Sequence, residues 1–176
     1  MRRAPLAFRR ADLADVDQIV ELVESAYRGD ASRAGWTTEA DLLDGQRTDT
    51  EEIGSLIRGP STRIVLASDA RELVGSVLLA EQRARTYVGM LTVKPRMQTQ
   101  GVGRALLAEV ERITRDEQLG DRIRMTVIGQ RSELIAWYAR RGYVPTGERE
   151  PFPYGQPRFG LPRRDDLYFT VLEKKL

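Results

Sequence analysis

The sequence of 176 residues contains no cysteine and no histidine. The absence of cysteine excludes disulfides, thiolate metal sites and a covalent cysteine nucleophile. The absence of histidine removes the commonest general base and the commonest metal ligand. We therefore expect no metal site. Any catalysis must use carboxylates, tyrosine, lysine, hydroxyl groups, backbone amides or water.

The sequence also lacks a long apolar run and a strong excess of one charge. No window approaches the roughly 18 apolar residues that a membrane helix needs. The first residues carry Arg2, Arg3, Arg9 and Arg10 but no apolar core of the kind found in signal peptides. The formal net charge is only +2, which does not indicate wholesale nucleic-acid binding. We expect a cytoplasmic protein without a membrane or nucleic-acid partner, and whether it is a homodimer stays open.

What is present is typical of a globular protein with its own core. Hydrophobic residues make up 41% of the chain and charged residues 31%. This length suits one domain spanning residues 1–176. Apolar periodicity and turn residues predict the elements. Extended segments are expected at 6–10, 63–81 (a hairpin), 85–93, 122–128 and 167–174. Helices are expected from Asp12 to about Tyr27, from Gly101 to near Gly120 and at 132–141, with short helical stretches at 38–45 and 50–58. Four prolines within 151–162 predict a loop there.

The segment "LTVKPRMQTQGVGRALL", Leu91 to Leu107, places two glycines where a strand gives way to a helix. The first amides of a helix are unpaired and its N-terminus is partially positive, so glycines there let a phosphate approach the backbone. No Gly-Lys-Ser/Thr follows, which excludes a P-loop. Leu106 replaces the third glycine of a dinucleotide fingerprint. An ordinary glycine-containing loop that caps a helix remains the alternative.

The stretch "VKPRMQTQGVGRALL" resembles the acetyl-CoA motif of the GNAT family of N-acetyltransferases, in which Val-x-Pro precedes Arg/Gln-x-x-Gly-x-Gly/Ala. Gln98, Gly101 and Gly103 match its signature positions. The opening "FRRADLADVDQIVELV", the strand "LVGSVLLAE" and the late segment "WYARRGYVPTGE" are also similar to the family, so the resemblance covers most of the chain. It implies a mixed α/β fold. We expect a mostly antiparallel twisted sheet of six or seven strands with a parallel, splayed central pair, flanked by about four helices.

The resemblance also implies roles in binding acetyl-CoA. The amides of Leu91 and Val93 would bond the pantetheine arm, and the Leu91 amide would polarise the thioester carbonyl. The segment from Gln98 to Arg104 would cradle the pyrophosphate. The implied contacts are Leu91, Thr92, Val93, Gln98, Thr99, Gln100, Gly101, Val102, Gly103, Arg104 and Arg131. Arg131 stands where the family often has asparagine, so its contact can differ.

Tyr138 matches the family's general acid, which protonates the departing thiolate. The general base is less certain, because residues 85–93 lack the carboxylate that often serves the family there. Glu81, Glu148 and Glu150 are candidates, acting directly or through water, and a solvated surface carboxylate is the alternative for each.

Residues 28–60 and 148–166, the variable parts of the resemblance, would form the lips of the acceptor site. Residues 28–58 hold four arginines and seven acidic residues, a net charge of −3. Such an acidic lip would favour a cationic amine, although two solvated helix faces are the simpler explanation of the charges. Trp36 would either pack or stack on a substrate.

The function implied is transfer of an acyl group, most simply acetyl from acetyl-CoA, to a primary amine of a small molecule or protein. Direct transfer in a ternary complex is expected because no cysteine can carry the acyl group. A non-catalytic CoA-binding sensor or interaction module on the same fold is the alternative. A nucleotide-binding regulator is disfavoured by the missing third glycine.

Overall fold

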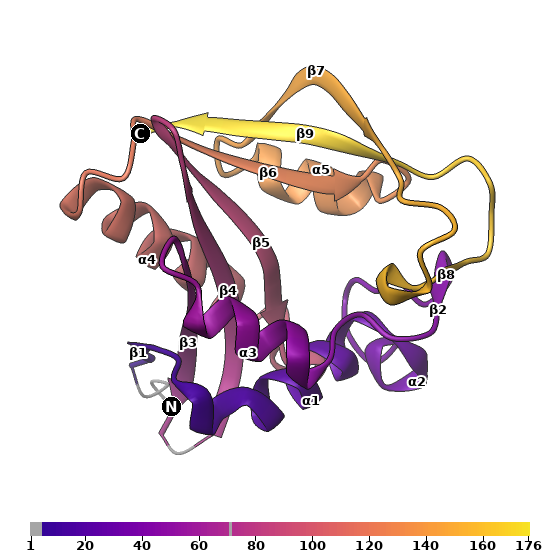
Figure 1. Cartoon of the computed structure of the whole chain (residues 1–176), viewed down its shortest axis with the longest axis horizontal. Helices are drawn as coiled ribbons and strands as arrows, with labels where there is room; N and C mark the ends of the chain where they lie inside the picture. Colours follow the sequence, from indigo (N-terminus) through magenta and orange to yellow (C-terminus); the bar gives the residue numbers. More distant parts are fainter. Residues whose placement is uncertain (1–4, 71) are drawn as a thin grey trace.

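The computed structural model describes residues 5–70 and 72–176 and centres on a seven-stranded sheet (Figure 1). In spatial order its strands are β1 (Ala7–Arg10), β3 (Thr62–Asp69), β4 (Glu72–Gln82), β5 (Arg85–Val93), β6 (Arg122–Ile128), β9 (Tyr168–Lys175) and β7 (Val144–Pro151). A second sheet pairs β2 (Leu43–Asp44) with β8 (Leu161–Pro162). The helices are α1 (Val16–Tyr27), α2 (Gly29–Ser32), α3 (Thr50–Arg58), α4 (Val102–Asp116) and α5 (Ser132–Ala139). Single 3-10 turns occupy Leu13–Asp15, Pro95–Met97 and Pro157–Phe159.

The central pair of strands, β5 and β6, is parallel, whereas the other neighbouring pairs of this sheet are antiparallel. The parallel register joins only Thr86 to Ile123 and Tyr87 to Arg124. Beyond these residues the two strands diverge, so the sheet opens like a V (Figure 1). The predicted mixed fold with a parallel, splayed central pair is confirmed.

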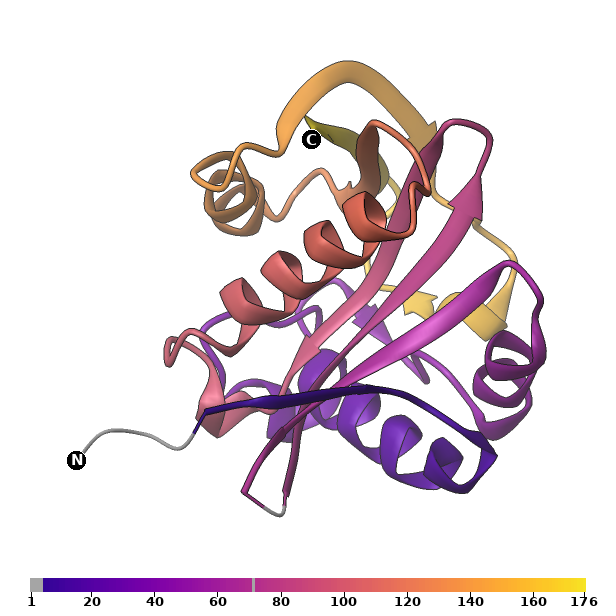
Figure 2. The same ribbon diagram turned by 90° about the vertical axis from the view of Figure 1, so that its left-hand side faces the viewer.

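Helices cover both faces of the sheet (Figure 2). On one face α4 buries its apolar stripe, including Leu106 and Val110, against β3 and β4. On the opposite face α1 and α3 pack Ile19, Val23 and Ile53 against the strands. The 3.6-residue spacing of apolar positions in these helices accounts for the packing. No helix within the described residues has the length and apolar character needed to cross a membrane.

Two local predictions were wrong. Residues 38–45 are not helical, because they form a turn and then β2, whose Leu43 pairs with Pro162 of β8. Segment 151–162 is therefore more than a loop: it holds the end of β7, a 3-10 turn and β8. Proline is tolerated in β8 because the strand is a short edge strand. This long-range pairing brings the two variable segments together.

Candidate active site

The site is built around an irregularity in β5 where the sheet opens. The register between β4 and β5 shifts between Ser76 and Leu78, which leaves Met90 and Leu91 opposite Val77. Met90 has a φ of 44°, and the Thr92 hydroxyl donates to the Met90 carbonyl at 2.9 Å. A bulge of this kind turns the backbone away from the regular ladder. It therefore re-aims the chain at Met90 and Leu91 where β5 leaves β6.

Two cavities adjoin this opening. The first, of about 270 Å³, reaches from β5 to the N-terminus of α4 and to α5. The second, of about 410 Å³, lies between the diverging ends of β5 and β6 and the segments at 39–52 and 150–159. Both cavities are lined by Tyr27, Leu91, Arg131, Leu134 and Tyr138. These shared residues mark the junction at which molecules in the two cavities would meet.

The N-terminal end of α4 is suited to binding an anion. Gly101 is its N-cap, with a φ of 85° and no capping side chain, and an added Cβ there would meet nothing within 4 Å. A Cβ on Gly103 would lie 3.4 Å from the ring of Trp137. The first amides of the helix thus face a cavity without a side chain to cap them. Arg104 adds positive charge to the same lining.

A second arginine of the first cavity, Arg141, was missed by the sequence analysis. Its guanidinium lies 3.7 Å from the ring centroid of Trp137, and its Nη1 donates to the Trp137 carbonyl at 2.7 Å. Its Nε is buried and has no hydrogen-bond partner in the part of the chain that the structure describes. Burial, together with Arg140 and Arg104, lowers the pKa of Arg141. The spacing of four residues from Trp137 was the available signal, since it places both side chains on one helix face.

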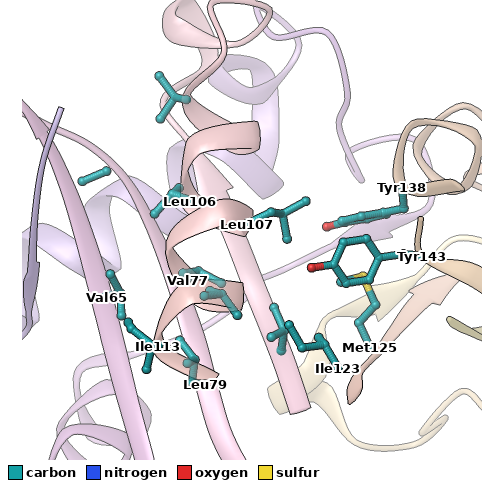
Figure 3. Packing of buried hydrophobic residues seen from close by; sticks show 14 of the residues in the cluster. Val65, Val77, Leu79, Leu106, Leu107, Ile113, Ile123, Met125, Tyr138 and Tyr143 are labelled. Atoms are coloured by element: carbon teal, nitrogen blue, oxygen red, sulfur yellow. The ribbon is translucent and has the colours of Figure 1, made fainter. Parts of the chain in front are cut away.

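Tyr138 lies at the junction of the cavities and is only 6% exposed. Its ring packs edge-on against Trp137, with centroids 5.0 Å apart, and against Tyr143, with centroids 6.1 Å apart. Figure 3 shows its hydroxyl pointing away from α5 toward the side of α4. Within the described part of the chain this hydroxyl makes no hydrogen bond. Burial, and to a lesser degree Tyr27, raises the pKa of Tyr138, so the phenol keeps its proton near neutral pH.

The wall between the cavities contains a buried ion cluster. Arg28 Nη1 lies 2.5 Å from Glu39 Oε2, and Arg131 Nη1 lies 2.8 Å from Glu39 Oε1. Arg131 Nη2 also donates to the Thr37 hydroxyl at 2.8 Å. Burial raises the pKa of Glu39, but the guanidiniums of Arg131 and Arg28 outweigh it, so this pKa lies below its ordinary value. Glu39 is therefore an anion fixed between cations.

Comparison with known protein families identifies the family to which the chain belongs. Residues 38–152 match the sequence profile described as "Acetyltransferase (GNAT) domain". The chain belongs to the GNAT acetyltransferase family. No curated protein matches the chain significantly.

Solved structures share the GNAT fold over almost the whole chain. A GNAT-family protein from Desulfovibrio desulfuricans has a TM-score of 0.71 at 19% identity, covering 97% of this chain and 99% of that chain. The ribosomal-protein-S18-alanine N-acetyltransferase of Escherichia coli has a TM-score of 0.71 at 12% identity, with 97% and 94% covered. For yncA of Salmonella typhimurium, solved with its cofactor acetyl-CoA, the TM-score is 0.71 at 17% identity, with 98% and 95% covered. At these identities the likeness shows the fold alone.

The residues predicted from the GNAT resemblance largely converge on the first cavity. Gln98 also bridges two segments, because its Nε2 donates to the Val93 carbonyl and its Oε1 accepts from the Thr37 amide, each at 3.2 Å. Two predicted residues lie outside the lining: Val102 is buried in the core and Gln100 donates to the Arg96 carbonyl. The lining includes Leu91, Thr92, Val93, Gln98, Thr99, Gly101, Gly103, Arg104 and Arg131.

Two of the predicted base candidates, Glu81 and Glu148, lie elsewhere. Glu81 stands opposite Thr86, near the closed end of the V, and pairs with Arg63 at 3.1 Å. Glu148 pairs with Arg124 at 2.7 Å. Neither carboxylate lines either of the two cavities, because the antiparallel registers carry both toward the end where β5 and β6 are still joined. The geometry therefore gives neither a place beside Tyr138.

Glu150, the third carboxylate considered for the base, does line the second cavity. Its Oε1 lies 3.3 Å from Arg124 Nη2. Trp36 lines the first cavity and lies 6.5 Å, between ring centroids, from Trp137. This contact favours packing at the cavity mouth over a place in the acceptor site for Trp36.

Proposed function

We propose that this GNAT protein transfers an acetyl group from acetyl-CoA to a primary amine, directly and within a ternary complex. The observation that carries the proposal is the position of Tyr138. Its unbonded hydroxyl lies where an anion-suited cavity meets a second cavity large enough for a small acceptor. The bulged backbone at Leu91 borders both.

The first cavity fits acetyl-CoA. The phosphates of acetyl-CoA would be held by the uncapped N-terminus of α4 and by the guanidiniums of Arg104 and Arg141. The unpartnered Nε of Arg141 is a donor that a phosphate oxygen would satisfy. Along β5, the edge facing the gap has lost β6 beyond Tyr87, so its backbone can bond the amide groups of the pantetheine arm as an added strand would.

In the proposed reaction, residues at the junction of the two cavities have separate roles. The neutral amine attacks the thioester carbonyl carbon, a nitrogen–carbon bond forms, and the carbon–sulfur bond breaks. The Leu91 amide would stabilise the oxyanion, and Tyr138 would give its proton to the departing thiolate. The phenol is protonated at neutral pH, and burial, which raises the pKa of Tyr138, does not make it a stronger acid, so its contribution would come from its position beside the departing sulfur.

The acceptor must lose a proton before or during attack, since an ordinary ammonium has a pKa near ~10.4. Glu150 borders the second cavity and is the carboxylate that we propose for this step, through water. Glu81 and Glu148 would need longer relays, because they lie outside both cavities.

The test is a panel of primary amines incubated with acetyl-CoA, with free thiol and acetylated product both measured. Thiol release matched by product supports the acetyltransferase. Tight CoA binding without turnover on any small amine or peptide would favour the CoA-binding module instead. Hydrolysis alone, without acetylated amine, would also contradict the proposal.

A further inference from the structure

Three guanidiniums gather around Glu39 in the wall of the second cavity. Arg28, Arg47 and Arg131 all line this cavity, and Glu39 lies among them. Glu39 pairs with Arg28 and Arg131, and the Arg47 guanidinium also helps to lower its pKa. Within this cluster one carboxylate stands against three guanidiniums, although Glu52 and Glu150 bring the whole lining to three of each charge. An uncompensated charge in such a place is costly unless a ligand supplies the counter-ion.

Arg47 is the cation with spare hydrogen-bonding capacity. Its guanidinium lies 5.4 Å from the ring centroid of Tyr27, and no ion pair or side-chain hydrogen bond joins it to another described residue. Its backbone is held in place, since Glu24 Oε1 accepts from the amides of Arg47 at 2.6 Å and Thr48 at 2.8 Å. Arg47 is half-buried and lines the cavity, so its guanidinium can present several donors there.

The remaining carboxylates of the cavity do not neutralise Arg47. Glu52 accepts from the Thr48 hydroxyl at 2.6 Å and lies in the first turn of α3, where the helix dipole stabilises it. Glu150 is paired with Arg124. Neither lies within 4 Å of the Arg47 guanidinium among the pairs formed by residues 5–70 and 72–176.

Buried donors in the same cluster also lack partners. Nε and Nη2 of Arg28 and Nε of Arg131 are buried and have no hydrogen-bond partner among the described residues. A Cβ on Gly160 would lie 3.0 Å from Arg28 Nη2, so the segment before β8 closes over this arginine. Arg28 and Arg131 thus raise the positive potential of the wall, and Arg47 is left as the contact for an anion.

The same cavity also has an apolar and aromatic part. Phe152 stacks on Phe169 with centroids 5.7 Å apart, and Phe159 is 39% exposed at the rim. Met90 and Met125 line the β5 and β6 sides. Such a surface suits an aliphatic or aromatic group.

We infer that the acceptor is an amine that also carries a carboxylate and an apolar side chain, as a free hydrophobic amino acid does. This inference rests on the proposed acetyl transfer. The amine would lie at the Tyr138 junction, the carboxylate against Arg47 and the side chain against the phenylalanines. It revises the expectation of a cationic acceptor drawn from the acidic composition of residues 28–58. Asp30, Asp41, Asp44 and Glu51 are exposed and line neither cavity.

The experiment compares matched acceptors with saturating acetyl-CoA. L-phenylalanine is set against 2-phenylethylamine and L-phenylalaninamide, and L-leucine against 3-methylbutylamine and L-leucinamide. We expect kcat/KM to be about 10–10²-fold higher for each acid than for its decarboxylated or amidated partner, as for one charge-assisted contact. Equal or better turnover of the partners that lack a carboxylate would overturn the inference while leaving the acetyltransferase intact. Absence of turnover on every amine would instead contradict the proposed function.

Variants at position 47 test whether Arg47 contacts the carboxylate of the acceptor. In Arg47→Gln the ratio of acid to amine should fall toward one, and Arg47→Lys should keep part of it. Taking this ratio within each variant cancels differences in intrinsic reactivity between the two amines. Arg58→Gln, an exposed change on α3 outside both cavities, should keep the wild-type ratio. Circular dichroism and CoA binding check that each variant folds. A folded Arg47→Gln that keeps the full preference would remove Arg47 from the site.

Discussion

Arg131 and Glu39 form a buried ion pair, with 2.8 Å between Nη1 and Oε1, although 92 residues separate them in the chain. Arg131 is the N-cap of α5, the helix that carries Tyr138. Glu39 lies in the irregular segment after α2 and also binds Arg28. The pair therefore fixes the segment that walls the second cavity against the helix that supplies the proposed general acid.

Removing the negative charge of Glu39 should lower the free energy of unfolding. Glu39→Gln keeps the size of the side chain but leaves two buried guanidiniums without a counter-ion. Loss of one member of a buried pair costs about 3–5 kcal/mol, so urea unfolding should show a decrease in the free energy of unfolding of that order. Asp41→Asn removes an exposed carboxylate 2.7 Å from Arg33 and is the control. Its effect should stay within about 1 kcal/mol. Similar losses in both variants would contradict a special role for Glu39.

The same pair predicts a pH dependence. Because the pKa of Glu39 is lower in the folded protein, its contribution to stability is complete above the unfolded-state pKa of about 4.3. The contribution is lost as the pH falls through the folded-state value. The difference in unfolding free energy between wild type and Glu39→Gln should therefore shrink as the pH falls below about 4. A difference that grew with acidity would have the wrong sign.

Tyr138→Phe should slow chemistry without loosening acetyl-CoA. The ring stays packed between Trp137 and Tyr143, and only the hydroxyl is removed. A positioned general acid contributes roughly 10²–10⁴-fold, so kcat should fall by that factor while the KM for acetyl-CoA changes little. Tyr143→Phe is the matched control, because its hydroxyl bonds Glu111 and lines neither cavity. Near wild-type turnover in Tyr138→Phe at all pH values would leave Tyr138 a packing residue.

Gly103→Glu should abolish tight binding of CoA. The new side chain would start 3.4 Å from Trp137 and bring a negative charge to the uncapped N-terminus of α4. Calorimetry should show the affinity collapse, with helical content retained. Ala108→Glu places the same charge at an exposed position farther along α4 and should bind CoA normally. If a folded Gly103→Glu protein kept its affinity, the phosphates would have to bind elsewhere.

Initial-rate kinetics should give intersecting lines when acetyl-CoA and the amine are varied. The chain has no cysteine to carry an acetyl group, and the two cavities meet at Tyr138 and Leu91, where the reactants can touch directly. Parallel lines, together with a kinetically competent acetylated enzyme seen by mass spectrometry, would contradict direct transfer.

Local sequence patterns were enough for the elements that frame the site. The hairpin predicted at 63–81, the strands at 85–93 and 122–128 and the helix after Gly101 appear close to their predicted bounds, because each has its own apolar period and turn residues. Tyr138 and the glycine loop could be located because a motif with fixed spacing marks them.

The acceptor wall could not be predicted in the same way. The pairing of β2 with β8 and the contact of Glu39 with Arg28 and Arg131 depend on segments far apart in the chain. Residues 38–45 have no period that distinguishes a turn from a helix. Their conformation follows from tertiary contacts, and so do the charges that finally face the cavity.

The V between β5 and β6 has a consequence for association. Unpaired strand edges usually lie at the border of a sheet, where they can recruit another chain. Here the divergence after Tyr87 and Arg124 creates two such edges in the middle of the sheet, flanked by α1 on one side and α4 and α5 on the other. The unpaired backbone amides and carbonyls of β5 and β6, which a slender ligand can bond, therefore lie in the middle of the sheet and not at its outer strands, β1 and β7. The protein can offer strand-like binding without adding an outer edge that invites aggregation.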